Sequence, residues 1–319
     1  MIIDGFGHVM PKSFCDTLLK VYPTDELREL SVLPYFGDVE NRLRVLDKHG
    51  IDKQVLTLAR ASIWVSMPPK VAPEMVRVAN DAVAEFAATH PDRFIATATL
   101  PFPTDEYLDE FDRCVNQLKV AGIQIMSNAN GKQLDDPDFR SFFSRANDTK
   151  TPIWIHPQLH AGWSQQYVLD KIFGWPFDTT MAMARLVFSG VMEEFQNLNI
   201  VVHHMGAMVP HFAERIKGFY DAGPMFPRAQ FKPMREDPLV YFKRFYGDSV
   251  LNGSVHAFEC GYKFFGPEHI VFATDYPFGP KQGEEWMAGA LHQVRTIDLP
   301  AHEKELIFSG NLLRIMEKW

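Results

Sequence analysis

Cysteine is scarce in this chain of 319 residues, and its scarcity excludes a fold held together by disulfides. The three cysteines, Cys15, Cys114 and Cys260, form no CxxC pair and no even-numbered framework. Small extracellular scaffolds depend on disulfides because their cores are small, whereas a chain of this length can bury a large core. The unpaired thiols therefore indicate a reducing compartment.

Long apolar runs and an excess of basic charge are also missing. No apolar run reaches the roughly 18–20 residues that a membrane-spanning helix needs. Lys and Arg number 32 against 40 Asp and Glu, and this net charge of −8 argues against a nucleic-acid or anionic-membrane surface. The first residues carry no signal-peptide pattern. These absences predict a soluble cytoplasmic protein with neither a nucleic-acid nor a membrane partner.

A glycine-rich nucleotide turn is the third absence. Gly5-Phe6-Gly7-His8 follows the first apolar segment, but no third glycine comes at the GxGxxG spacing. A doubly wound open sheet usually carries that turn after its first strand. The sequence therefore disfavours this open-sheet alternative.

The chain does contain a regular alternation of short β-like segments and longer helical patterns. Several of the short segments are continuous apolar runs, as in a parallel sheet buried on both faces. We predict eight strands, at Met1–Ile3, Lys53–Leu58, Phe94–Leu100, Gly122–Met126, Pro152–His156, Asn199–His203, Arg244–Gly247 and Ile270–Thr274. The apolar spacing predicts helices at Asn41–His49, Pro73–Thr89, Thr179–Phe195, Met208–Tyr220, Val255–Phe264, Glu284–Thr296 and Asn311–Lys318, and one more that Thr104 caps. Eight strand–helix units predict an α/β protein with one domain over residues 1–319, a (β/α)8 TIM barrel.

Histidines and one aspartate stand where predicted strands end. His8 follows the first strand, His156 ends the fifth, His204 follows the sixth and Asp275 follows the eighth. The chemistry of (β/α)8 barrels occurs at this end of the strands. Neutral imidazoles and one carboxylate suit Zn²⁺ or a similar divalent ion. We therefore expect His8, His156 and Asp275 to bind one metal ion, with His204 nearby as an acid/base group.

Each of these residues also has a purely structural alternative. A histidine at a strand end is most often a satisfied polar group, and Asp275 could cap the helix that follows it. His203 should point away from His204 because side chains alternate along a strand, which predicts a packing role for His203. The metal site is favoured because four such residues end four different strands.

Motifs along the chain resemble the amidohydrolase superfamily, and more closely its amidohydrolase-related (α-amino-β-carboxymuconate-ε-semialdehyde decarboxylase-like) family. The segment Arg42–Leu56, RLRVLDKHGIDKQVL, is similar to that family's RL..MD..GID.QVL motif. Phe272–Phe278, FATDYPF, is close to its lFgSDyP signature. Further matches lie at Ile2–Pro11, at Asn80, at Phe86–Phe94, at His204–Gly206 and at Gly310-Asn311. The resemblance covers essentially the whole chain and implies a metal-dependent TIM barrel.

The resemblance also implies roles for single residues. His8, His156 and Asp275 fall on metal-ligand positions, and His204 falls on the position of the catalytic histidine. In a decarboxylase, Asp275 or His204 would deliver a proton to the carbon that loses the carboxylate.

On the substrate side, Arg42 falls on a contact to the substrate carboxylate, and Trp175 lies in a Gly-Trp-Pro segment that lines the pocket in relatives. Arg215 has the spacing of an arginine that reaches a neighbouring subunit's active site. Phe6 would shape a flat apolar pocket, and His160 would face its mouth. The alternatives are that Arg42 only flanks its helix, that Trp175 is core and that Arg215 is solvated.

Two positions depart from the family pattern. Phe6 stands where relatives carry a histidine or glutamate, and phenylalanine cannot ligate a metal. The ion would then be held by three groups, or His204 would join them, and binding would be weak or absent. Met126-Ser127-Asn128 ends the fourth strand where binuclear relatives place a carboxylated lysine, so we expect one metal at most.

The resemblance implies a metal-dependent non-oxidative decarboxylase, a carbon–carbon lyase acting on a small aromatic or unsaturated carboxylic acid. One divalent ion is expected, Zn²⁺ first and Mn²⁺ as the alternative. Two other functions stay open: a metal-dependent hydrolase or hydratase of a lactone, amide or unsaturated acid, and a metal-free, non-catalytic ligand-binding homologue. The assembly of relatives implies a homodimer or homotetramer.

Overall fold

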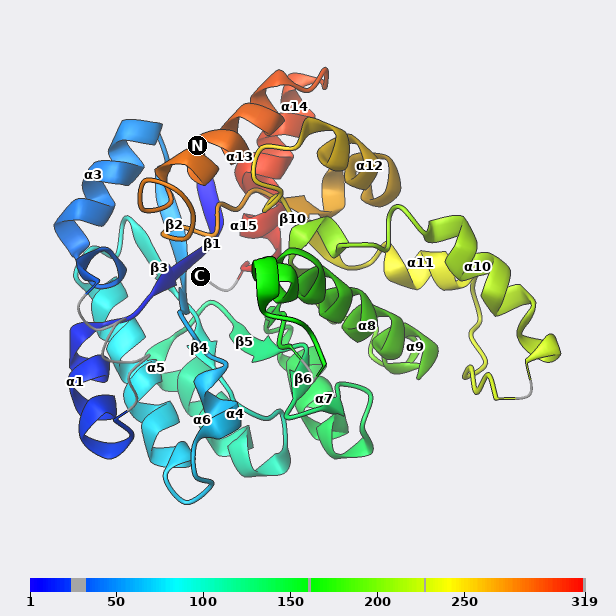
Figure 1. The fold of residues 1–319 in the computed structure, drawn as a ribbon, viewed down its shortest axis with the longest axis horizontal. Helices are drawn as coiled ribbons and strands as arrows, with labels where there is room; N and C mark the ends of the chain where they lie inside the picture. Colours follow the sequence, from blue (N-terminus) through cyan, green and yellow to red (C-terminus); the bar gives the residue numbers. More distant parts are fainter. Residues whose placement is uncertain (24–32, 160–161, 227, 318–319) are drawn as a thin grey trace.

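Parallel strands lie at the centre of the structure and helices surround them (Figure 1). This computed structural model describes residues 1–23, 33–159, 162–226 and 228–317. The strands are β1 (Ile3–Val9), β2 (Lys53–Leu58), β3 (Phe94–Ala96), β4 (Ala98–Thr99), β5 (Ile123–Met126), β6 (Asn128–Ala129), β7 (Lys132–Gln133), β8 (Ile153–His156), β9 (Ile200–Val202), β10 (Tyr246–Asp248) and β11 (Ile270–Val271). The α-helices are α1 (Lys12–Val21), α3 (Val39–His49), α4 (Ile63–Ser66), α5 (Ala72–Ala88), α6 (Leu108–Arg113), α7 (Arg140–Thr149), α8 (Trp175–Phe188), α9 (Val191–Glu194), α10 (Ala213–Asp221), α11 (Pro238–Phe242), α12 (Val255–Phe265), α13 (Glu284–Thr296), α14 (Ala301–Glu305) and α15 (Asn311–Ile315).

The wall of the barrel is built from two runs of parallel strands. One run has the order β1-β2-β3 and the other the order β11-β10-β9-β8-β5-β4. Only Thr97 separates β3 from β4, so the two runs are continuous there. At the other junction, the Asp275 amide donates to the Phe6 carbonyl over 3.0 Å, and Gly7 bridges to Tyr276. The strands therefore surround a common axis, and the predicted (β/α)8 barrel is confirmed.

Some predicted boundaries are confirmed and others are wrong. The strand at Lys53–Leu58 and the helix at Glu284–Thr296 are confirmed residue for residue. The strand at Met1–Ile3 is wrong, because β1 runs from Ile3 to Val9. The predicted helix Thr179–Phe195 is broken at Gly190, which has φ 81° and separates α8 from α9. Thr104 precedes the 3-10 turn before α6, but its side chain makes no capping bond.

Side chains that point into the barrel place the residues at the strand ends. Trp154, Val201 and Ala273 belong to one buried apolar cluster inside the barrel. Because side chains alternate along a strand, the residue two positions later continues on the same side. Two positions after these three residues come His156, His203 and Asp275, listed here in the same order. The alternation therefore directs three polar side chains toward the barrel axis.

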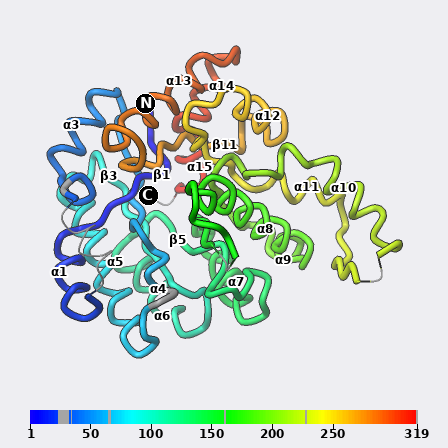
Figure 2. The backbone as a smooth tube through the Cα atoms, in the orientation of Figure 1, coloured from blue at the N-terminus to red at the C-terminus, as the bar shows by residue number. Residues whose placement is uncertain are grey.

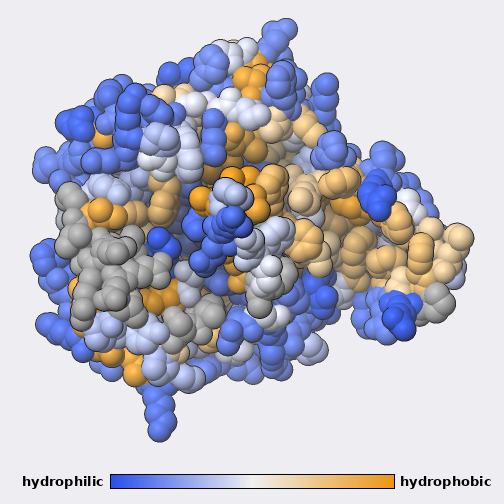
Figure 3. Space-filling model, in the orientation of Figure 1, coloured by the Kyte–Doolittle hydropathy of each residue, from blue (hydrophilic) through white to orange (hydrophobic). Residues whose placement is uncertain are grey.

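A projecting arm formed by α10 and the turn after it extends away from the strands (Figures 1 and 2). Apolar side chains gather on its visible face (Figure 3). Phe212, Phe219, Met225 and Phe226 are between 40% and 78% exposed. Exposed aromatic clusters of this kind are typical of interaction surfaces.

Among the described helices, none has the length and apolar character that a membrane crossing requires.

Candidate active site

The imidazole rings of four histidines and the carboxylate of Asp275 lie close together at the C-terminal ends of the strands. His8 Nε2 lies 3.1 Å from Asp275 Oδ1. The ring centres of His8 and His156 are 5.5 Å apart, and those of His156 and His203 are 5.2 Å apart. The ring of His204 lies 5.5 Å from that of His203. The structure therefore brings together the predicted residues His8, His156, His204 and Asp275.

His8 is held rigidly at the end of β1. Its side chain is 1% exposed, and its Nδ1 lies 3.1 Å from the hydroxyl of Thr57 on β2. Its backbone carbonyl accepts a hydrogen bond of 2.5 Å from the Arg42 guanidinium. These contacts turn the Nε2 atom of His8 toward Asp275.

Burial favours the neutral forms of His8, His156 and His204. Desolvation lowers the pKa of His8 and lowers that of His156 well below its ordinary value. It also lowers the pKa of His204 to about 4. Neutral imidazoles keep a lone pair on one ring nitrogen, which can accept a proton or ligate a metal. The site is therefore rich in neutral nitrogen donors at physiological pH.

A buried carboxylate, Asp4, ties β1 to the strand end that carries Asp275. Asp4 accepts hydrogen bonds from the Phe6 amide (3.2 Å), the Gln54 side chain (2.7 Å) and the Thr274 amide (3.0 Å) and hydroxyl (2.5 Å). Burial raises the pKa of Asp4 to about 6, although these hydrogen bonds act to lower it. Asp4 thus positions the residues next to both His8 and Asp275.

Arg42 lies behind the site. Its side chain is 0% exposed, donates to Gln54 Oε1 over 2.6 Å and packs 5.0 Å from the centre of the Tyr276 ring. Burial lowers the pKa of Arg42 to about 10. In this arrangement the guanidinium has no exposed surface to offer a substrate carboxylate. It instead braces β1 through Gln54 and the carbonyl of His8.

The other predicted substrate-side residues occupy different surroundings. Trp175 begins α8, is partly exposed, and its ring lies 6.1 Å from that of His156. Phe6 is fully buried, with its ring 4.7 Å from that of His8, so it forms the floor of the site. Arg215 is exposed on the projecting arm and lies over the Phe219 ring. His160 lies outside the described residues.

His203 lies at the site, where the sequence predicted only a packing role for it. That packing role agrees with its burial, at 4% exposure, and with its contact to Phe6. The chain leaves the strand geometry after His203, because β9 ends at Val202 and His204 has a left-handed φ of 57°. The His203 ring lies 3.9 Å from Phe6 and among the site histidines. The signal in the sequence was the inward position two residues after Val201.

The donor set suits a divalent ion in its chemistry. Neutral imidazoles and a carboxylate are the ligands that Zn²⁺ and similar ions prefer. Nε2 of His203 is buried and makes no hydrogen bond among the described residues, and Nε2 of His8 has only the Asp275 carboxylate, 3.1 Å away, as a polar neighbour. As these residues are placed, no group of three or more His, Cys, Asp or Glu side chains in the described chain could hold a metal. To bind one ion together, His8 and Asp275 would have to give up their direct contact, and each would then contact the ion.

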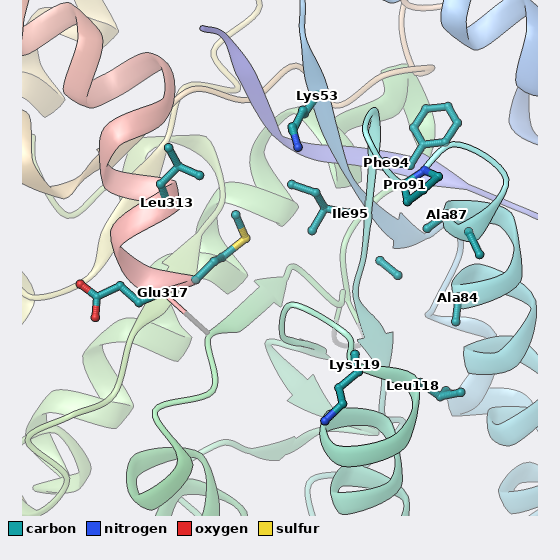
Figure 4. Close-up of a pocket in the computed structure, with 13 residues that line it drawn as sticks. Lys53, Ala84, Ala87, Pro91, Phe94, Ile95, Leu118, Lys119, Leu313 and Glu317 are labelled. Carbon is teal, nitrogen blue, oxygen red and sulfur yellow. The ribbon is translucent and has the colours of Figure 1, made fainter. Parts of the chain in front are cut away.

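A separate cavity of about 600 Å³ lies at the opposite end of the barrel (Figure 4). Lys53 and Phe94, which begin β2 and β3, line it together with Leu313 of α15. Its described lining contains no histidine, and most of it is aliphatic. Its charged lining residues are Lys53, Lys119 and Glu317, and it lies away from the C-terminal ends of the strands, so the histidine cluster is the stronger candidate for the chemistry.

Comparison with known proteins identifies similar chains. The family profile described as "Amidohydrolase" matches residues 21–315. The 2-amino-3-carboxymuconate-6-semialdehyde decarboxylase of Dictyostelium discoideum is 29% identical over 282 residues, which cover 88% of this chain and 76% of that protein. The crystal structure of 5-carboxyvanillate decarboxylase from Sphingomonas paucimobilis has a TM-score of 0.85 at 26% identity, covering 99% of this chain and 98% of that one. The enzyme of the same name from Novosphingobium aromaticivorans, solved with manganese and a nitrobenzoic acid, has a TM-score of 0.87 at 23% identity, covering 99% and 96%.

Proposed function

The chain belongs to the amidohydrolase family, and from this premise we propose that it is a metal-dependent non-oxidative decarboxylase, a carbon–carbon lyase. Its substrate would be a small aromatic or unsaturated carboxylic acid. The observation that carries the proposal is the cluster of neutral histidines beside Asp275 at the catalytic end of the barrel. The names of the similar proteins, which are decarboxylases of such acids, support the same reaction class.

The proposed metal ligands are His8, His156 and Asp275, which would hold one divalent ion. When bound, a divalent ion stabilises the negative charge that develops as carbon dioxide leaves. Zn²⁺ is the first candidate because imidazole and carboxylate suit it. The manganese in the Novosphingobium structure belongs to that protein, and here it makes Mn²⁺ the second ion to test.

The residues of this chain then have separate tasks. The bond between the ring or alkene carbon and the carboxylate breaks, carbon dioxide leaves, and the same carbon takes a proton. Asp275 and His204, both partly exposed beside the buried His8, are the groups placed to relay that proton from solvent water to the carbon. Trp175 presents a flat apolar face next to His156, against which an unsaturated substrate can lie.

The projecting arm supports self-association into a homodimer or homotetramer. Four exposed apolar side chains stand on it: Phe212, Phe219, Met225 and Phe226. Arg215 lies on the same surface, where it and Phe219 help to line a cavity of about 350 Å³. In an assembly built through this arm, Arg215 would be the cation offered to a substrate carboxylate of the neighbouring copy.

Carbon dioxide release is the decisive assay. Purified protein, stripped of metal and then reloaded with Zn²⁺ or Mn²⁺, is incubated with hydroxybenzoates, carboxyvanillate and muconate-type acids. We expect metal-dependent release of carbon dioxide from at least one acid. Turnover of lactones or amides without carbon dioxide would favour the hydrolase alternative instead. A metal content below about 0.1 ion per chain, with no activation by added ions, would exclude the metal mechanism.

A further inference from the structure

His203 is the buried histidine for which the proposed ligand set has no use. Its side chain is 4% exposed, and the edge of its ring meets the Phe6 ring at 3.9 Å between centres. The side chain of Phe6 has no nitrogen, oxygen or sulfur atom, so it cannot ligate a metal on its side of the cluster. His203 stands directly beside that side, 5.2 Å from His156.

The carboxylate of Asp248 lies against one nitrogen of the His203 ring. The side chain of Asp248, fully buried at the end of β10, places Oδ2 2.8 Å from His203 Nδ1. Its other oxygen accepts the backbone amides of His204 (2.9 Å) and Val250 (3.1 Å), so the carboxylate itself is held from two sides. The Oδ2 atom makes no hydrogen bond among the described residues, so the contact is an ion pair that by its charge favours the ring proton on Nδ1 and the lone pair on Nε2.

The Nε2 atom of His203 is therefore a nitrogen with a free lone pair in a buried place. It makes no hydrogen bond to any described residue. A packing role beside Phe6 would be served by any apolar ring and would leave the unpartnered Nε2 atom without a use, at the cost of burying it. In metal sites, by contrast, a ligating histidine commonly donates its other ring N–H to a carboxylate.

Two of the ring separations match those of imidazoles that share an ion, although a group of three donors would have to move to reach one ion. Two imidazoles that bind one ion at the usual Zn–N distance of about 2.1 Å have ring centres about 5 Å apart. The measured separations are 5.2 Å for His156 and His203 and 5.5 Å for His8 and His156.

We propose that His203, oriented by Asp248, is a ligand of the divalent ion and supplies the donor that Phe6 cannot. The ligand set of this chain is then His8, His156, His203 and Asp275. The inference rests on the metal dependence proposed above, but it does not depend on which reaction the metal supports.

Metal binding itself is the test, measured on the full chain without substrate. The metal-stripped protein is titrated with Zn²⁺ by calorimetry, and with Co²⁺ by visible absorption, which reports the number and geometry of ligands. We expect His203→Ala to weaken Zn²⁺ binding by at least about 10-fold and to change the Co²⁺ spectrum, and Asp248→Asn to weaken it by about 10-fold. His256→Ala, which removes an exposed histidine on α12, is the matched control and should bind like the unmodified protein.

The outcomes separate the two proposals. Unchanged Zn²⁺ affinity in a folded His203→Ala protein, or an unmodified protein that binds no divalent ion, would overturn the assignment. If His203→Ala does not fold, His203→Gln, which keeps a polar group facing Asp248, is titrated instead with the same expectation. Tight metal binding that depends on His203, in a protein that releases no carbon dioxide from any acid, would support this ligand and reject the decarboxylase.

Discussion

Single side chains at the catalytic end of the barrel owe their chemistry to burial. His8, His156 and His204 have lowered pKa values because desolvation disfavours their charged forms. The carboxylate of Asp275 lies against His8 and remains partly exposed. A neutral donor cluster next to one accessible carboxylate can serve both metal binding and proton transfer.

The proton-transfer assignment predicts severe losses for two variants. His204→Ala and Asp275→Asn should each lower kcat/KM for the decarboxylated acid by about 10²- to 10⁴-fold, because each removes a group beside the reacting carbon. His256→Ala should keep full activity. Steady-state carbon dioxide release measures the effect, and near-normal rates in both folded variants would contradict the assigned roles.

Gly7 lies where the structure has no room for a Cβ atom. A Cβ on Gly7 would collide with the side chain of Gln54, which links Arg42 to Asp4. Gly7→Ala should lower the free energy of unfolding by about 1–3 kcal/mol, as overpacking does. Gly218→Ala is the matched control: nothing lies within 4 Å of its Cβ position, and it sits in α10. Urea unfolding of both variants tests this, and equal stability would show that Gln54 moves aside freely.

At the scale of elements, polar residues join helices to the barrel wall. Asn80 of α5 accepts the Thr99 amide of β4 over 2.8 Å and donates to Glu110 of α6 over 2.8 Å. The Arg113 guanidinium, close to Glu110, holds the pKa of that carboxyl below its usual range. One buried amide therefore connects two helices and a strand.

Removing that amide should weaken all three elements together. Asn80→Ala leaves the buried Thr99 amide without its acceptor and removes one of the donors to Glu110, so we expect a loss of about 1–3 kcal/mol in the free energy of unfolding. Glu85→Ala, at an exposed position of α5, should change it by less than about 0.5 kcal/mol. Chemical denaturation distinguishes the two, and a neutral Asn80→Ala would show that water replaces the amide.

Elements also differ in how far their own residues determine them. The strand at Lys53–Leu58 was predictable because Val55, Leu56 and Leu58 form a short apolar segment that includes β-branched residues. β1 was not, because Asp4, Gly5 and Gly7 carry no strand preference. Its extended form comes from pairing with β2 and from hydrogen bonds to the chain at Phe272 and Tyr276. Those partners are about 50 and 270 residues away in the sequence.

For the whole molecule, the buried histidines make stability depend on pH. The folded pKa values of His8, His156 and His204 lie below their unfolded values, so the unfolded chain binds more protons below about pH 6.5. Their contribution to stability is present above that pH and is lost as the pH falls. Asp4 acts in the opposite direction, because its folded pKa of about 6 exceeds its unfolded value and its contribution falls as the pH rises from about 4 to 6.

Because three histidines oppose one carboxyl, the free energy of unfolding should rise between about pH 5 and 6.5. Each group changes it by up to about 1.4 kcal/mol per pH unit. Urea unfolding at several pH values in metal-free buffer measures the slope, and Asp4→Asn should make it steeper. A slope that is flat or negative in the unmodified protein would contradict the neutral state of the histidines.

The projecting arm gives a second prediction for the whole molecule. Phe219→Asp places a charge among the exposed apolar side chains of the arm and should convert the assembly to monomers. Leu313→Asp, at a 43% exposed position of α15, should leave the assembly unchanged. Light scattering reads the mass of each. An unmodified protein that is already monomeric would remove both the assembly and the role of Arg215 in a neighbouring site.

The amino-acid sequence by itself determined the alternation of strands and helices, and with it the end of the barrel at which His8, His156 and Asp275 lie. Local hydrophobic periodicity is sufficient for that, because the buried side chains of a helix or a strand recur at fixed intervals along the sequence. Only the tertiary structure decided which side chains face one another. It placed the Arg42 side chain against the His8 carbonyl, behind the site, and it placed His203 next to Asp248 and the other histidines. Those orientations depend on where β9 ends and on contacts between residues distant in the chain, and no local pattern encodes either.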